Sequence, residues 1–356
     1  MHTGRSERSR ISELVLKKFM SKKAVLLINL GSPDSIEVKD VRRYLKQFLM
    51  DPRVMDSSPF IRWWVVNFLI LPFRPKKTAE AYKRIWTHEG SPLIIYSKDL
   101  QNALSEVTNM DVELAMSYGQ PTIADAVKRL KEKNIAELLI IPLFPHYAMS
   151  SYETALVAIM EAIRKMMPNL KTETLQPFYQ DLDYIDALVE SSKSYLNKDF
   201  DHLLFSFHGL PERHLRKSDP SHSHCMVTPD CCNTCNPAHA TCYKHQCLQT
   251  VKLFAQRANL PAEKYSVSFQ SRLGRDPWLQ PYTDHQISQF PEKGIKKLLV
   301  ICPAFVADCL ETLEEIAMAD KESFIDAGGV SFEQIPCLNM HPRWIEFLMN
   351  KVKLWT

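Results

Sequence analysis

Glycine is scarce in this chain, with only nine among 356 residues. A G-x-G-x-x-G fingerprint after a strand, or a phosphate-binding P-loop, needs closely spaced glycines that let the backbone approach a phosphate. Neither pattern occurs in the sequence. The sequence therefore gives no support for a nucleotide-binding protein, and an α/β pattern alone would not establish one, because many functions share such folds.

A strong charge of either sign and a long apolar run are also missing. The formal net charge is +3, with acids and bases interspersed, so there is no basic stripe of the kind that nucleic-acid-binding surfaces carry. The longest apolar run, residues 59–73, is interrupted by Arg62 and Asn67 and falls short of the ~20 residues that span a bilayer. We expect no nucleic-acid partner and no spanning helix.

The first 22 residues are basic and polar, unlike the rest of the chain. They show no uninterrupted apolar core of a secretory signal, so we expect a cytoplasmic protein. We interpret residues 1–22 as a basic tail, with Met20 as an alternative start directly before the first predicted strand. A weak contact with an anionic membrane is the other interpretation.

Cysteine, in contrast, is concentrated. Six of the nine cysteines lie in one short window: Cys225, Cys231, Cys232, Cys235, Cys242 and Cys247. A disulfide framework suits small secreted domains, whereas a long chain that is 45% hydrophobic can bury a large core without cross-links. We therefore expect the window to bind a metal. The remaining three, Cys302, Cys309 and Cys337, lie among apolar residues and are interpreted as packing residues.

Short aliphatic and β-branched runs alternate with amphipathic segments along the chain. Runs that are apolar on both faces are typical of buried parallel strands, and the alternation predicts a doubly wound α/β architecture. The eight predicted strands cover residues 24–30, 112–117, 137–143, 173–178, 202–208, 265–270, 297–302 and 331–336. The clearest predicted helices cover residues 122–133, 151–166, 182–196, 310–320 and 344–354.

Eight strands fit two similar Rossmann-like halves, each a four-stranded parallel sheet flanked by helices. We place the halves at residues 23–198 and 199–356, with the C-terminal helix able to pack back on the first half. Ligands of such sheets bind outside the carboxyl ends of the strands. The residues that come directly after each strand are therefore the first candidates for a functional site.

Two ring side chains stand at such positions. His208 ends the fifth predicted strand and is followed by Gly209 and Pro211, so its place is rigid. An imidazole there can act as a base or a metal ligand, or can be a core histidine bonded to a neighbouring carbonyl. Trp278 comes after the sixth strand and can stack on a flat ligand or fill space beneath a loop.

Carboxylates come after the seventh strand. If a helix begins near Asp308, then Asp308, Glu311 and Glu315 share one of its faces. Such a stack can pass a divalent cation along the helix. The alternative is a solvated face whose acids complement the positive end of the helix dipole.

Five segments, in order along the chain, together resemble the ferrochelatase family, whose members insert ferrous iron into a porphyrin at the end of haem synthesis. They are LINLGSP near the start, YKRIW with GSPL in residues 82–93, SFHGLP, FQSRLGRDPWLQPYTD and CPAFVADCLETLEEIA. The resemblance implies a chelatase-like pair of Rossmann-like halves with a porphyrin cleft between them. It also implies a lyase that takes protoporphyrin IX and ferrous iron (Fe2+) as substrates.

The resemblance also assigns roles to single residues. It places the family's catalytic histidine at His208 and its essential glutamate at Glu311. From the shared helix face we further expect Asp308 and Glu315 to line an ion or proton path. A base is needed because metal insertion displaces two pyrrole protons. Porphyrin contacts are expected at five residues: Leu30, Arg84, Tyr118, Tyr147 and Trp278. Ser117 and Cys309 depart from the family's arginine and histidine, so those two contacts are not transferred.

Residues 218–247 look like an insertion, and they resemble a bacterial subgroup that holds an internal [2Fe–2S] cluster. Four thiolates suffice for such a cluster. The expected ligands are Cys225, Cys242 and Cys247, together with one of the vicinal pair Cys231 and Cys232, and Cys235 competes with that pair. Zinc is the alternative, because Cys232 and Cys235 have finger-like spacing and histidines lie nearby.

The apolar residues 59–73 suit the lip of a porphyrin cleft, and the same lip can touch the inner face of a membrane peripherally. A buried core helix is the alternative. The sequence leaves open whether the protein is a monomer or a homodimer. It also leaves open whether the substrate is coproporphyrin or another tetrapyrrole, and whether the chain is a non-catalytic porphyrin-binding or iron–sulfur sensor protein.

Overall fold

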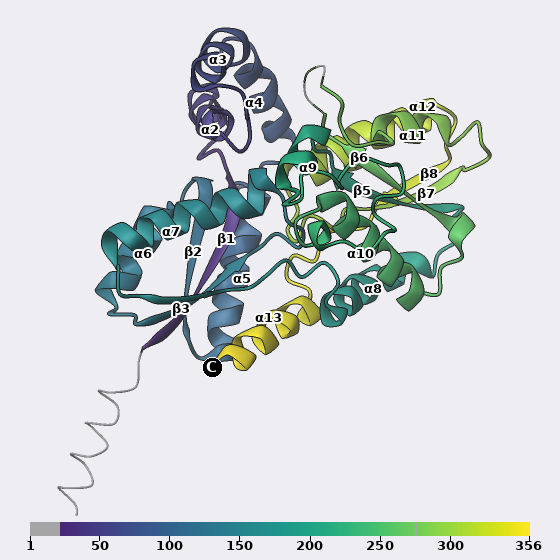
Figure 1. Ribbon diagram of the computed structural model, residues 1–356. Helices are drawn as coiled ribbons and strands as arrows, with labels where there is room; N and C mark the ends of the chain where they lie inside the picture. The colour runs from purple at the N-terminus through teal and green to yellow at the C-terminus, as the bar shows by residue number, and fades with distance from the viewer. Residues whose placement is uncertain (1–21, 273, 275) are drawn as a thin grey trace, which may run out of the picture.

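Two four-stranded parallel sheets form the cores of two halves that lie side by side in the computed structural model (Figure 1). The structure describes residues 22–272, 274 and 276–356, so the predicted basic tail lies outside the described residues except for Lys22. The first sheet has the strand order β2-β1-β3-β4, and the second has the order β6-β5-β7-β8. This arrangement confirms the predicted fold class.

The strands lie close to the runs predicted from the sequence. They are β1 (Lys23–Ser32), β2 (Asp111–Gly119), β3 (Glu137–Pro142), β4 (Lys171–Thr174), β5 (His202–His208), β6 (Tyr265–Gln270), β7 (Lys297–Ile301) and β8 (Ser331–Gln334). The edge strand β4 ends four residues before the predicted end. Leu175 still donates its N–H to the carbonyl of Ile140 at 2.9 Å, but Pro177 has no N–H to continue the ladder.

The first half buries both faces of its sheet because alternate side chains of a strand point to opposite sides. Val25 and Leu27 of β1 pack in the cluster that includes α5, whereas Leu26 and Ile28 pack in the cluster of α6 and α7. The helical elements are α2 (Val38–Met50), α3 (Pro59–Trp64), η1 (Val65–Ile70), α4 (Arg74–Ile85), α5 (Pro92–Thr108), α6 (Ile123–Glu132), η2 (Met149–Glu153) and α7 (Thr154–Met166).

The second half repeats this layering. Leu204 and Val300 pack with Phe324 on one face, and Phe205 packs with Phe254 on the other. Its helical elements are α9 (Glu212–Ser218), η3 (Pro237–Ala240), α10 (Tyr243–Arg257), η4 (Ala262–Lys264), α11 (Thr283–Gln289), η5 (Glu311–Asp320), α12 (Lys321–Asp326) and α13 (Pro342–Trp355). Helix α8 (Leu182–Leu196) comes before the boundary placed at residue 198 but packs on α10 of this half. The C-terminal helix α13 contacts both α8 and α5, so it joins the two halves (Figure 1).

Membrane crossing requires a long apolar helix. Among the residues that the structure describes, no helix is both long and apolar enough to cross a bilayer.

Candidate active site at the carboxyl ends of the strands

His208 is the last residue of β5 and is half-buried. Its Nδ1 lies 2.6 Å from the carbonyl oxygen of Gly209. Because a carbonyl only accepts, Nδ1 carries the proton and Nε2 keeps a lone pair that can act as a base. Gly209 is needed here: a Cβ at this position would lie 2.8 Å from the carbonyl oxygen of Gln270 and 3.3 Å from the ring of Trp278. This crowding explains why a glycine follows His208 in the SFHGLP segment.

Glu311 begins η5, directly after the loop that leads on from β7. Its carboxylate is hydrogen-bonded to the thiol of Cys309, and its negative charge adds to burial in raising the pKa of Tyr44 and Tyr82. Tyr44 in turn donates to the carbonyl of Gly31 at 3.2 Å. Glu311 of the second half therefore lies close enough to Tyr44 and Tyr82 of the first half for its charge to act on them.

The element η5 is a π-helix, not the predicted α-helix. A π-helix bonds residue i to i+5, so residues four or five apart fall in line: here Glu311, Glu315 and Asp320. Glu315 accepts a hydrogen bond from the hydroxyl of Ser271. Burial, with the charge of Glu311 second, raises the pKa of Glu315 to about 7. Burial followed by the charge of Asp284 raises the pKa of Asp320 to about 7.

Asp308 lies before the π-helix, and its carboxylate is buried. It accepts hydrogen bonds from Asn339 Nδ2 at 2.6 Å and from Thr312 Oγ1 at 2.9 Å. The α-helical face predicted to join Asp308 with Glu311 and Glu315 is therefore not formed. Protein donors occupy the carboxylate of Asp308 and anchor the start of η5.

Arg84 of α4 forms an ion pair with Glu314 of η5, across the two halves. The sequence motifs place Arg84 at the porphyrin and give no sign of a role for Glu314. Nothing in the local pattern could have found this pair, because its members lie 230 residues apart in the chain. The exposed guanidinium of Arg84 stays accessible at the edge of the site.

The other predicted porphyrin contacts lie at or after strand ends of the first half. Leu30 is half-buried near the end of β1. Tyr118 is buried at the end of β2, where its hydroxyl donates to Asp51 at 3.1 Å. Tyr147 comes after β3, and its hydroxyl donates to Glu153. The structure thus brings these residues to the same edge of the first sheet, and it places Trp278 beside Gly209, directly after β5 of the second.

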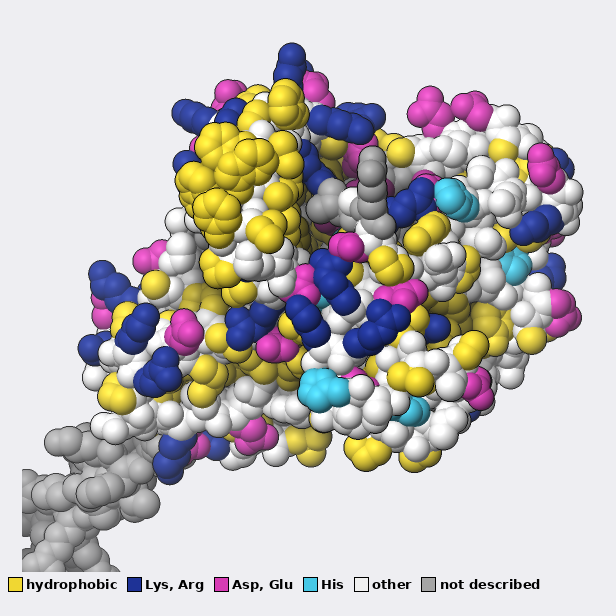
Figure 2. Space-filling view, turned by 45° about the horizontal axis from the view of Figure 1, so that its top comes forward, with side chains coloured by type: hydrophobic (Ala, Val, Ile, Leu, Met, Phe, Trp, Pro, Cys, Tyr) yellow, Lys and Arg dark blue, Asp and Glu magenta, His cyan; other side chains and the backbone are white. Residues whose placement is uncertain are grey.

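The elements α3 and η1 form an exposed apolar surface, which we call the lip. Phe60 is 74% exposed and Phe73, just after η1, is 76% exposed. The exposed large apolar residues of the lip are Phe60, Ile61, Trp63, Trp64, Phe68, Leu69 and Phe73. Figure 2 shows them gathered on one projection of the molecule. The interpretation of this segment as a buried core helix is therefore wrong.

The cysteine-rich segment brings buried thiols together. Cys225 and Cys232 hydrogen-bond to Cys242, and the bond from Cys232 is the main cause that lowers the pKa of the Cys242 thiol. Cys231 and Cys247 are also buried, whereas Cys235 is exposed, and all six are free thiols. In the described part of the chain, no three or more His, Cys, Asp or Glu side chains are grouped to hold one metal ion. The thiols of Cys225, Cys232 and Cys242 are nevertheless soft, buried donors of the kind that hold an iron–sulfur cluster. His224, His239 and His245 bond to the carbonyls of Cys231 and Cys232 in the same segment.

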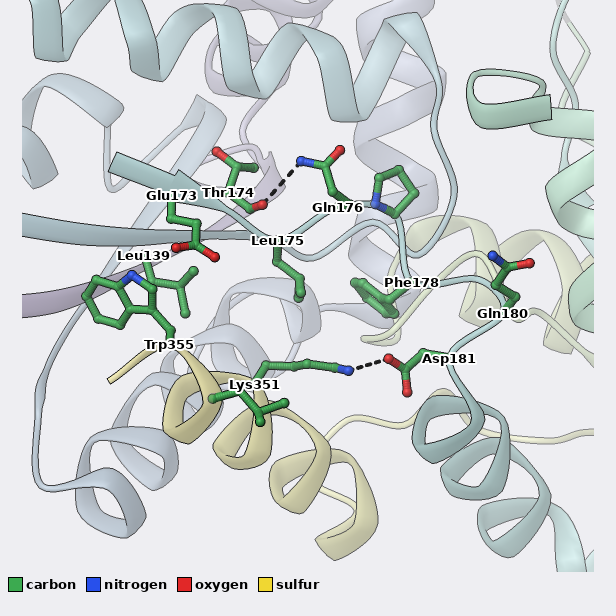
Figure 3. A pocket seen from close by; sticks show the side chains of 12 residues that line it. Leu139, Glu173, Thr174, Leu175, Gln176, Phe178, Gln180, Asp181, Lys351 and Trp355 are labelled. Atoms are coloured by element: carbon green, nitrogen blue, oxygen red, sulfur yellow. Dashed lines mark hydrogen bonds and ion pairs between the residues drawn. The ribbon is translucent and has the colours of Figure 1, made fainter. Parts of the chain in front are cut away.

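A cavity of about 430 Å³ lies away from these residues, between the end of β4 and α13 (Figure 3). Leu175, Phe178 and Trp355 supply apolar walls, and Lys351 forms an ion pair with Asp181 at its side. None of the predicted site residues lines this cavity. It is therefore separate from the candidate active site.

The fold and the site define a chelatase-like α/β protein. The structure of SirB from Bacillus subtilis with Fe3+ has the same fold, with a TM-score of 0.52 at 12% identity, covering 93% of this chain and 94% of that chain. A protein-family model described as Ferrochelatase matches residues 22–354. The ferrochelatase of Opitutus terrae is 52% identical, covering 94% of this chain and 98% of that protein, and the ferrochelatase of Ectopseudomonas mendocina is 50% identical, covering 92% and 97%. The chain therefore belongs to the ferrochelatase family, which confirms the predicted enzyme class, a metal-chelating lyase.

Proposed function

We propose that the chain inserts ferrous iron into protoporphyrin IX to form protohaem, with His208 and Glu311 acting on a porphyrin held between the two halves. The observation that carries this proposal is the placement of the two residues. His208 ends β5 in the second sheet, where the neutral ring has its lone pair on Nε2, and the charge of Glu311 acts on Tyr44 of the first half. Membership of the ferrochelatase family supports it.

The reaction exchanges two pyrrole protons for one Fe2+ ion, so a base and a route for the ion are both needed. Nε2 of His208 accepts the first displaced proton and releases it to water, which frees Nε2 to accept the second. Ferrous iron sheds water as it enters, and the carboxylate of Glu311 replaces part of that water. Glu315 and Asp320 continue the row outward, and an approaching cation drives off the protons that they hold near neutral pH. Asp308 is not part of the proposed route, because Asn339 and Thr312 occupy its carboxylate.

The porphyrin needs apolar walls and cationic partners. We assign the walls to Leu30, Tyr118, Tyr147 and Trp278, which lie at the facing strand ends. Arg84 is the proposed partner of a propionate, because a guanidinium binds a carboxylate through two parallel hydrogen bonds. Binding then replaces the carboxylate of Glu314 with that of the substrate.

Iron insertion by purified variants tests the assignment. Wild type, His208→Ala and the control His285→Ala, whose ring is exposed on α11, are compared with protoporphyrin and coproporphyrin. Removal of a general base costs on the order of 10²–10⁴ in rate, so His208→Ala should lose that factor and His285→Ala should keep wild-type turnover. Equal turnover by His208→Ala contradicts the mechanism, and a strong preference for coproporphyrin contradicts the substrate.

The second proposal concerns the cysteine-rich segment. In this proposal the segment binds a [2Fe–2S] cluster through Cys225, Cys232 and Cys242, because the first two thiols each contact that of Cys242. One further buried thiol, Cys231 or Cys247, supplies the fourth ligand. Metal insertion is not a redox reaction, so the cluster supplies folding free energy for the segment. Visible absorption with iron and sulfide analysis tests this: Cys242→Ser should lose the colour and Cys235→Ser should keep it. A colourless protein with stoichiometric zinc contradicts the cluster.

The lip is proposed to touch a membrane peripherally, because contiguous exposed apolar surface marks interaction sites. Flotation with liposomes should carry wild type upward and leave Trp63→Glu/Trp64→Glu behind. Val330→Glu, at a more exposed apolar position between α12 and β8, is the control and should float. Flotation of the double variant at the wild-type level contradicts the contact.

A further inference from the structure

Helix α10 joins the cysteine-rich segment to the loop after β3. Gln246, on the first turns of this helix, is 0% exposed. Its Oε1 accepts the backbone N–H of Tyr147 at 2.7 Å. Its Nε2 donates to the carbonyls of His239 at 3.2 Å and Ala240 at 2.9 Å. One buried amide therefore ties η3 of the cysteine-rich segment to the main chain of Tyr147.

One turn further along α10, Thr250 contacts His146, which precedes Tyr147 in the loop after β3. His146 Nε2 lies 2.9 Å from the hydroxyl of Thr250, which donates to the carbonyl of Tyr179 at 2.8 Å. The ring of His146 stands edge-on against Phe207, with centroids 5.4 Å apart. Phe207 immediately precedes His208. Helix α10 is thus hydrogen-bonded to this loop at Tyr147 and at His146. Through the ring of His146 it is also linked to β5, the strand that ends in the proposed base.

The network continues from Tyr147 into the first half. The hydroxyl of Tyr147 donates to Glu153, which also accepts from Nε of Arg53 at 3.0 Å. Arg53 lies in the connection that leads from α2 to the lip. A contiguous set of hydrogen bonds therefore runs from the cysteine-rich segment, through Gln246 and Tyr147, to the base of the lip.

We infer that Gln246 is a positioning residue that couples the order of the cysteine-rich segment to the porphyrin pocket through the backbone of Tyr147. A segment organised by a metal loses its fixed structure when the metal is removed. The carbonyls of His239 and Ala240 then no longer hold the amide of Gln246, and Tyr147 loses its fixed acceptor. Such coupling is reciprocal, so porphyrin binding should also stabilise the segment. The inference rests on the proposed roles of Tyr147 and of the thiols.

The experiment uses three variants of the full chain. Gln246→Met removes both sets of hydrogen bonds at nearly constant size, and Gln246→Glu keeps an acceptor for Tyr147 but loses the amide donors. Gln256→Met makes the same change at an exposed position near the other end of α10 and is the control. Measured are visible absorption for the metal content of the segment, the porphyrin dissociation constant by fluorescence quenching, and KM and kcat for iron insertion.

The expected signature is a change of binding without a change of chemistry. Loss of a buried hydrogen bond should raise the porphyrin Kd and KM of Gln246→Met about three- to tenfold, with kcat and metal content unchanged. Removing the metal from wild type with a chelator should raise Kd by a similar factor. It should add nothing further in Gln246→Met, because two changes to one route are not additive.

The two substitutions at Gln246 separate positioning from folding. Gln246→Glu should bind porphyrin more tightly than Gln246→Met and should no longer respond to the chelator. Wild-type affinity in Gln246→Met, or full chelator sensitivity in either variant, overturns the inference. If Gln246→Met loses its metal, the porphyrin affinity of Gln246→Glu with and without chelator becomes the test. No response supports the inference, and full sensitivity overturns it. An inactive wild type or an active His208→Ala instead overturns the proposed function, so the two failures are distinct.

Discussion

The two halves share one topology and differ in the segments to which equivalent strands lead. The match extends to the turns after β2 and β6: Met116 donates its N–H to the carbonyl of Pro121, and Phe269 donates to Pro281, both at 2.8 Å. Yet β1 leads through Gly31 to the apolar lip, whereas β5 ends in His208 and leads to the cysteine-rich segment. In the proposed function, the first half thus supplies surface for a large flat substrate, and the second supplies the titratable and metal-binding groups.

The contrast is sharpest after β3 and β7, because each of these strands is followed by a π-helix, η2 or η5. Glu153 of η2 is paired with Arg53 and with the hydroxyl of Tyr147. Glu315 of η5 is bonded to the hydroxyl of Ser271, and burial raises its pKa to about 7. Under the proposed function, equivalent windings therefore serve packing in one half and proton or ion transfer in the other.

The largest expected effect on the rate comes from replacing a glutamate by glutamine in each of the two π-helices. Glu311→Gln removes the carboxylate proposed to meet ferrous iron and should lower kcat on the order of 10²-fold or more, as loss of a preorganised charge does. Glu153→Gln leaves a side chain that still accepts from Tyr147 and should lower kcat less than tenfold. Iron-insertion rates at saturating porphyrin check both. Equal losses in the two variants would show that the halves do not divide structure from chemistry.

A second test removes a charge that joins the halves. Asp56 of the first half is 7% exposed and accepts from Nε of Arg213 in α9 at 2.7 Å, and it also pairs with Lys217. Burial opposes its ionisation, but the hydrogen bonds from Lys217 and Arg213 outweigh this and lower the pKa of Asp56 to about 2. The carboxylate therefore stabilises the fold above pH ~4, and this contribution is lost as the pH falls through 2.

We expect Asp56→Asn to lower the free energy of unfolding by about 2 kcal/mol at pH 7. The difference from wild type should shrink toward pH 2. Chemical denaturation across this range checks both statements. Asp199→Asn removes a carboxylate from an exposed pair with Lys297 and should have no measurable effect. A pH-independent difference at Asp56 would assign the loss to packing instead of charge.

The fold was largely predictable because strand signals are local. Runs of buried aliphatic residues located all eight strands, and the family motifs located His208 at the end of β5 and Glu311 in the segment that follows β7. The winding of η5 was not predictable from the same patterns, since the apolar spacing of residues 311–320 reads equally well as an α-helix. This one difference removed Asp308 from the row of carboxylates and added Asp320 to it.

The contacts that unite the site were also out of reach of the sequence. Gln246 pairs with Tyr147 across 99 residues, and Asp56 pairs with Arg213 across 157. A glutamine in an amphipathic segment has the same local pattern whether it is buried or exposed. Only the packing of α10 against the loop after β3 gives Gln246 its partners.

The smallest expected effect tests the outer end of the carboxylate row. Burial, with the charges of Asp284 and Glu314, raises the pKa of Asp320 to about 7 from a usual value of 3.8. A carboxyl group with a raised pKa has no effect on the free energy of unfolding below pH ~4, because it is protonated in both states. It lowers that free energy increasingly as the pH rises to 7. Asp320→Asn should therefore match wild type at pH 4 and be more stable than wild type at pH 8. Asp326→Asn, exposed at the end of α12, should match wild type at both pH values. If Asp320→Asn is no more stable than wild type at pH 8, Asp320 is ionised at ordinary cost, and the contrast between the two π-helices is confined to Glu311 and Glu315.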